Sequence, residues 1–181
     1  MTRFVRYIVP VALIALAGCA SAPPMAYYTI AMDHTGAPAP AVNLSIDRIQ
    51  VAEALSRKDL LIKKSPTEIE YYAAAQWAAG VNDLVQEKLA EEFGPPREGM
   101  PTISLTLFVQ SFEQADLPEG AEARAKITVE FRKERYGDDL LKKTYTEREP
   151  AESNPNAIAQ ALSRCLERIA QNIAADAGKL Q

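Results

Sequence analysis

The 181-residue sequence has little of what metal centres and common hydrolase sites are built from. It contains a single histidine, His34, and two cysteines, Cys19 and Cys165. A His/Cys metal site or a histidine-dependent catalytic triad therefore has almost no residues to draw on. Two cysteines also exclude a disulfide-dense mini-protein. The sequence predicts a protein that is not an enzyme, holds no metal and requires no cofactor.

Excess positive charge is also lacking. The chain has 20 Lys and Arg against 24 Asp and Glu, which gives a formal net charge of -4, and its basic residues form no long block. A nucleic-acid binder needs a basic surface to neutralise phosphates, so neither DNA nor RNA is expected as a partner. With 48% hydrophobic residues and only 12 prolines and 8 glycines, the composition is that of a globular domain, neither disordered nor collagen-like.

No apolar run is long enough for a transmembrane helix. The longest such run covers residues 8–16, about half of what is needed to cross the hydrocarbon core. It follows Arg3 and Arg6 and ends in Leu16-Ala17-Gly18-Cys19, which resembles the lipobox of bacterial lipoproteins. We therefore expect residues 1–18 to be a lipoprotein signal peptide and Cys19 to become the lipidated first residue, carrying acyl chains such as palmitate. The alternative is an ordinary secretory signal with a chance cysteine.

Residues 19–26 are expected to form a short lipidated tether. They include Pro23 and Pro24 and reach only about 20 Å when extended. Two or more acyl chains hold a protein stably on a membrane, so the domain should stay close to the bilayer. Ala20 after the cysteine resembles the pattern of lipoproteins sorted to the periplasmic face of the outer membrane rather than retained at the inner membrane.

Residues 27–181 are predicted to form a single domain. Short strands are expected at 27–30, 42–51, 60–63 and 67–72, with a parity slip between Ile46 and Ile49 that indicates a bulge. From residue 73 the apolar residues recur at spacings of three and four until Gly94, which predicts an amphipathic helix of about five turns.

The second half of this domain repeats the order of strands and then a helix. Residues 102–112, 123–132 and 140–147 alternate apolar and polar side chains, as in an antiparallel meander. A final helix is expected after Asn154 and Pro155, ending near Gly178, with Cys165 among its buried residues. The predicted fold class is α+β: a mostly antiparallel sheet with two amphipathic helices packed on one face, in the order strands-helix-strands-helix.

One segment resembles a known family. Paired aromatics, Tyr71 and Tyr72, are followed by Trp77-Ala78 at the expected helix start, a pattern similar to the ABC-type transport auxiliary lipoproteins, the family of paraquat-inducible protein C. The lipobox and the early Tyr27-Tyr28-Thr29-Ile30 run fit the same family. Many members have Arg before the Trp and Pro shortly after it, where this sequence has Gln76 and Gly80.

The resemblance implies a function. It implies a non-catalytic lipoprotein that accompanies an ABC permease and ATPase and an MCE-domain protein in moving lipids between the inner and outer membranes. A homo-oligomeric ring is expected if the MCE partner is itself a ring. Two alternatives stay open: an outer-membrane assembly lipoprotein acting on a β-barrel machine, and a soluble carrier that holds an acyl chain between sheet and helices.

Two groups of residues are candidates for partner or lipid contact. The first is the aromatic cluster of Tyr71, Tyr72 and Trp77, because aromatic side chains supply large contact areas; the alternative is that Trp77 and one tyrosine fill the core. The second is the basic stripe of Arg124, Lys126 and Arg132, which should lie on the polar face of one strand and could meet anionic head groups or an acidic partner. The alternative is an ordinary solvated strand face.

Overall fold

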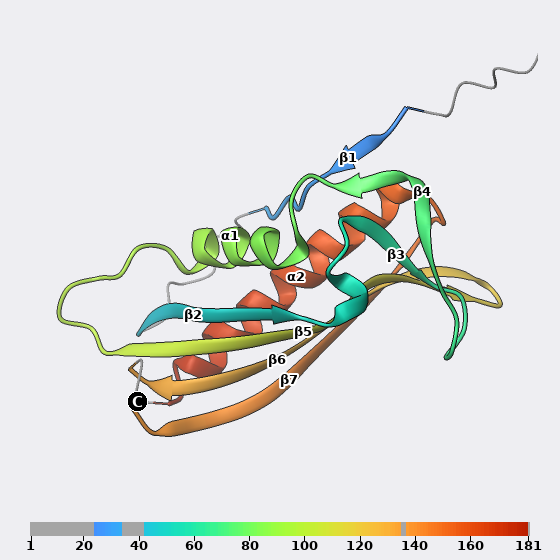
Figure 1. The fold of residues 1–181 in the computed structure, drawn as a ribbon. Helices are drawn as coiled ribbons and strands as arrows, with labels where there is room; N and C mark the ends of the chain where they lie inside the picture. The colour runs from blue at the N-terminus through green and yellow to red at the C-terminus, as the bar shows by residue number, and fades with distance from the viewer. Residues whose placement is uncertain (1–23, 34–41, 135–136, 181) are drawn as a thin grey trace, which may run out of the picture.

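The computed structural model describes residues 24–33, 42–134 and 137–180. The predicted signal peptide, Cys19 and His34 lie outside them. The described chain contains one sheet of seven strands, two α-helices and a short 3-10 helix, η1 (Figure 1). Their bounds are β1 (Ala26–Tyr28), β2 (Asn43–Val51), η1 (Glu53–Leu55), β3 (Asp59–Lys63), β4 (Ile69–Trp77), α1 (Val81–Phe93), β5 (Thr102–Leu117), β6 (Gly120–Lys133), β7 (Asp139–Ala151) and α2 (Pro155–Ala177).

The sheet is organised around β5, its longest strand at 16 residues. On one side β5, β6 and β7 form the predicted antiparallel meander. The other edge of β5 is shared, with β2 pairing along its first half and β3 pairing with Gln114 and Ala115, both in parallel. β4 is antiparallel to β3, and β1 is parallel to β4. The predicted α+β class is confirmed, with the first three strands adding parallel pairings.

Both helices lie on the same face of the sheet (Figure 1). Helix α2 packs along β5, β6 and β7, and α1 packs against β2 and α2. We call the opposite face of β2, β5, β6 and β7 the open face, because no helix of the described residues covers it (Figure 1). Two bulges shape it: the predicted one between Ile46 and Arg48 in β2, and a second between Val109 and Ser111 in β5.

The first helix begins later than predicted. Residues 73–77 belong to β4, where Ala75 pairs with Ala26 of β1 and the Trp77 amide donates to the Lys58 carbonyl at 2.7 Å. Three consecutive alanines favour a helix by propensity, but hydrogen bonds to strands on both sides hold them extended. Helix α1 therefore has only 13 residues, and it stops where predicted because Gly94 takes a φ of 70° that glycine adopts readily.

The C-terminal helix matches its prediction closely. The Asn154 side chain accepts a hydrogen bond from the Ala157 amide at 2.9 Å, and Pro155 occupies the first turn. The predicted stripe is buried against the sheet, and consists of Ile158, Leu162, Cys165, Leu166, Ile169 and Ile173. Cys165 is fully buried, and desolvation raises the pKa of its thiol to about 11. It is therefore a protonated core residue at neutral pH.

Ion pairs join the exposed flank of α2 to β7. Arg168 donates to Glu147 and to Glu149, each at 2.9 Å, and Arg164 also pairs with Glu149. The two carboxylates therefore hold the helix on the sheet.

A second clamp holds the C-terminal end of α2 and leads to a testable pH dependence. Asp176 accepts hydrogen bonds from Lys143, from Lys179 at 2.9 Å and from the Tyr145 hydroxyl at 2.9 Å. The Lys143 hydrogen bond is the main cause that lowers the Asp176 pKa from 3.8 to about 2. A carboxylate whose pKa is lowered by folding stabilises the native state above its unfolded pKa and loses this effect as the pH falls through the folded one.

We expect Asp176→Asn to lower the free energy of unfolding by about 1 to 2 kcal/mol at pH 7, a value discounted for the exposure of both lysines. The difference from the unmodified protein should shrink as the pH falls from about 4 to about 2. Urea unfolding of both proteins across this range measures it. A difference that is constant with pH would show that the ionised carboxylate is not what stabilises the helix end.

Candidate interaction surfaces

The paired tyrosines lie on β4 and are both half-buried. The Tyr71 hydroxyl donates to the Ala54 carbonyl at 3.0 Å, and the Arg57 guanidinium lies 4.4 Å from its ring centroid. The Tyr72 hydroxyl donates to Gln114, whose amide nitrogen donates in turn to Asp116 and Ser153. Desolvation raises the Tyr72 pKa. Each hydroxyl thus ties β4 to a neighbouring element, and contact of the exposed parts of the rings with a partner stays a prediction.

Trp77 is part of the core. Its side chain is 1% exposed, and its ring packs on Phe112 of β5 with the centroids 5.5 Å apart. The structure therefore shows the core alternative for this residue and leaves no indole surface for a partner. The reason is the strand conformation of residues 73–77, which turns Trp77 inward at the point where β4 leads into α1.

Gln76 lies near the end of β4. Its amide nitrogen donates to Asp59 at 2.9 Å, and this hydrogen bond is the main cause that lowers the Asp59 pKa. Arg57 pairs with the same carboxylate at 3.0 Å. A neutral amide and a nearby arginine therefore both bind Asp59 at the junction of β3 and β4.

The basic stripe lies on the open face, as expected from the alternation along β6. Arg132 donates to Asp139 at 2.7 Å, and Arg124 pairs with Glu122. Arg148 of β7 is directly opposite Arg124, and it lies 4.0 Å from the same Glu122 carboxylate. Like charges opposite each other across two strands are unfavourable. The stripe is thus more basic than the alternating sequence of β6 alone indicates.

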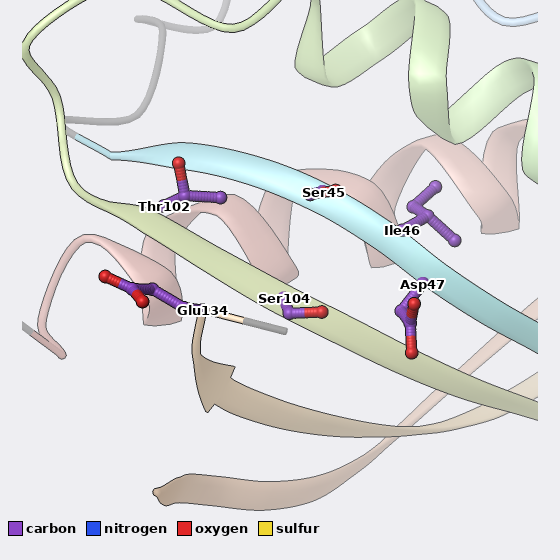
Figure 2. A pocket seen from close by; sticks show the side chains of 6 residues that line it. All are labelled: Ser45, Ile46, Asp47, Thr102, Ser104 and Glu134. Carbon is purple, nitrogen blue, oxygen red and sulfur yellow. The ribbon is translucent and has the colours of Figure 1, made fainter. Parts of the chain in front are cut away.

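Among the hollows lined by described residues, three lie along the open face. The first, of about 320 Å³, is lined by Ser45, Ile46, Asp47, Thr102, Ser104 and Glu134, and Figure 2 shows Asp47 and Ser104 on the neighbouring strands β2 and β5. The second, of about 350 Å³, lies between β6 and β7 around Arg132 and Lys142. The third, of about 400 Å³, is lined by Phe108 and Gln110 of β5 together with Thr128, Glu130, Lys142 and Thr144. The open face is therefore hollowed at these three places.

The sequence analysis missed Phe108, Gln110 and Arg48 as surface candidates. One signal was present: Phe108 occupies a polar-face position in an otherwise alternating strand. The bulge that places Gln110 beside it is visible only in the register between β5 and β6.

Other kinds of site find little support in the described part of the chain. No group of three or more His, Cys, Asp or Glu residues there could hold a metal ion. Neither helix of the described ranges is both long and apolar enough to cross a bilayer.

Comparison with known proteins identifies the family of this chain. The family model for the ABC-type transport auxiliary lipoprotein component matches residues 28–174, which run from β1 into the last turn of α2. The chain belongs to this family. By its description, the family is a lipoprotein component that is auxiliary to ABC-type transport. No curated protein matches the sequence closely enough to count as a relative.

Two solved structures share the fold. Protein XCC0632 from Xanthomonas campestris, a DUF330 protein, is 17% identical with a TM-score of 0.72, over 85% of this chain and 95% of that one. A crystal structure described only as an uncharacterized protein is 12% identical with a TM-score of 0.68, over 86% of this chain and 99% of that one. At such identities the likeness shows the fold alone, and the functional argument comes from the family match.

Proposed function

We propose that this protein is a lipoprotein anchored through Cys19 to the periplasmic face of the outer membrane, where it acts as the auxiliary component of an intermembrane lipid transport system. Its partners are an MCE-domain protein and an ABC permease with its ATPase. The observation that carries the proposal is the family match over residues 28–174, which begins nine residues after the lipobox cysteine.

A positioning role rather than a catalytic or carrier role is supported by how the side chains are used. The carboxylates Glu147 and Glu149, which could otherwise serve acid/base chemistry, are bound to arginines of α2. The space between sheet and α2 is filled by fully buried residues, among them Leu105, Ile127 and Leu166. A domain whose interior and whose carboxylates Glu147 and Glu149 are taken up by its own packing is suited to docking, and a partner would bind to its surface.

The start of the described chain supports a location close to the bilayer. Pro24 follows Cys19 by five residues, a span of at most about 18 Å. From there the chain enters β1, an edge strand on which Tyr27 is 68% exposed. A lipidated Cys19 would therefore hold the β1 and β4 side of the sheet near the membrane.

The proposal is tested by crosslinking in intact cells, followed by purification of the tagged full-length protein from membranes and identification of its neighbours by mass spectrometry. An MCE-domain protein together with an ABC permease and ATPase is the expected result. Components of a β-barrel assembly machine in their place would establish the alternative function. Native mass spectrometry of the same material reports the number of copies, and phospholipid bound to the domain would identify it as a carrier.

A further inference from the structure

The open face is organised in rows of side chains that cross the strands. One row runs from Gln50 of β2 through Phe108 of β5 to Thr128 of β6 and Thr144 of β7. All four side chains are uncharged, the two threonine hydroxyls are hydrogen-bonded at 2.7 Å, and Phe108 is 39% exposed. The phenyl ring is thus an apolar point at the centre of a neutral row.

Gln110 adds an unfilled acceptor next to this row. It lies in the β5 bulge and lines the same hollow of about 400 Å³. Its side-chain oxygen is buried and accepts no hydrogen bond from the residues that the structure describes. Burying an acceptor without a donor is costly, and bulges are frequent where a strand directs a side chain to a binding site. An N–H donor from outside the chain would satisfy this oxygen.

Positive charge in excess flanks the neutral row on both sides. Arg48 is paired in register with Thr106, and Lys126 with Ser111, so the two cations bracket Phe108. Within the described ranges neither has an ion-pair partner. The acidic residues near them are engaged: Glu130 with Lys142 at 2.7 Å, Glu122 with Arg124, and Asp47 also has an interaction of its own. This surface is therefore basic on a chain whose net charge is -4.

We propose that the row around Phe108 is the docking site for an acidic segment of a protein partner, a step that rests on the proposed function and specifies its contact surface. An apolar side chain of that segment covers Phe108, an N–H group donates to the Gln110 oxygen, and carboxylates pair with Arg48 and Lys126. A bilayer fits this site less well, because binding to a membrane surface grows with the apolar area that is buried in it. Of the large hydrophobic residues exposed in the described chain, Phe108 alone lies in this row.

The test places a photocrosslinking amino acid at the site in the full-length protein in its own cells. Phe108→p-benzoylphenylalanine is compared with Glu91→p-benzoylphenylalanine, an exposed position on α1. We expect ultraviolet light to produce a protein adduct at position 108 and none at position 91, with the crosslinked peptide rich in Asp and Glu. Lack of a protein adduct at 108, an adduct with lipid alone, or a crosslinked peptide without acidic residues would overturn the proposal.

Charge reversal and removal of the acceptor give independent readouts. Arg48→Glu with Lys126→Glu should lower the adduct yield about tenfold, since like charges then oppose the segment. An unchanged yield would contradict the charge argument. Gln110→Met should also lower the yield, while raising the melting temperature of the free protein by about 3 °C because the unpaired buried acceptor is gone. A lower melting temperature would show that Gln110 serves the free fold and would remove it from the site.

The outcome can be separated from that of the proposed function. If the transport components co-purify but nothing crosslinks at position 108, the function stands and the docking site is wrong. If an acidic segment crosslinks at position 108 but belongs to a protein outside any transport system, the docking site stands and the proposed function is wrong.

Discussion

Leu162→Asp should unfold the protein. Leu162 is 1% exposed at the centre of the α2 stripe, where a carboxylate would have neither water nor a cationic partner. Placing an unpaired charge in a packed core costs several kcal/mol, and loss of the leucine side chain adds about 2 to 5 kcal/mol. The sum is comparable to the whole stability of about 5 to 15 kcal/mol that domains have. Ile169 lies about two helical turns further along the same face and is fully buried. Ile169→Asp should therefore have the same effect.

Circular dichroism and urea unfolding of the purified domain measure this loss. Gln160→Asp is the matched control, because residue 160 lies on the same helix and is exposed; it should change the free energy of unfolding by only about 0.5 kcal/mol. A folded and stable Leu162→Asp protein would mean that α2 does not pack on the sheet as described and that Leu162 is not a core residue.

Cys19→Ser should abolish stable attachment to the membrane. A serine hydroxyl cannot take the thioether-linked lipid of the lipobox reaction, so the acyl chains, each CH₂ of which contributes about 0.8 kcal/mol to membrane binding, are lost. The protein should then appear in soluble fractions or keep its signal peptide, and it should no longer partition with membranes. Subcellular fractionation with detection of the tagged chain measures the change.

The control for this experiment is Ser21→Ala, which alters the tether and keeps the cysteine. That protein should fractionate with membranes as before. Mass spectrometry of the mature N-terminus supplies the chemical readout, since a lipidated Cys19 is heavier than the free residue by its acyl chains. Unchanged fractionation of Cys19→Ser, or an unmodified Cys19 in the native protein, would refute the anchoring mechanism.

Patterns of period two and of period three to four accounted for much of the fold. The strands β5, β6 and β7 and the helix α2 each bury only one face. The strands therefore show alternating apolar residues in the sequence, and the helix shows an apolar stripe. The Asn154 cap and the bulge in β2 were predicted for the same reason, because they depend on local residues. The family resemblance also came from local sequence motifs, namely the lipobox and the aromatic residues of β4.

Prediction failed where a distant strand overrode local preference. Residues 73–77 favour a helix when considered alone, yet their backbone groups are hydrogen-bonded to β1 and to the segment leading into β3. That pairing joins residues up to about fifty positions apart, and no local pattern encodes it. The same pairing explains why Trp77 is buried. It also explains why Tyr71 and Tyr72 donate their hydroxyl hydrogen bonds to η1 and β5.

The candidate docking surface divides in the same way. The sequence by itself determined that β6 has a basic polar face, because alternation alone separates Arg124, Lys126 and Arg132 from the buried residues between them. Only the tertiary structure decided which residues join them, since register places Arg148 opposite Arg124 and sets Arg48 and Lys126 on either side of Phe108. The β5 bulge added the unpaired oxygen of Gln110. Register between strands is a property of their packing, and a side chain's neighbours across a sheet are known only when that packing is.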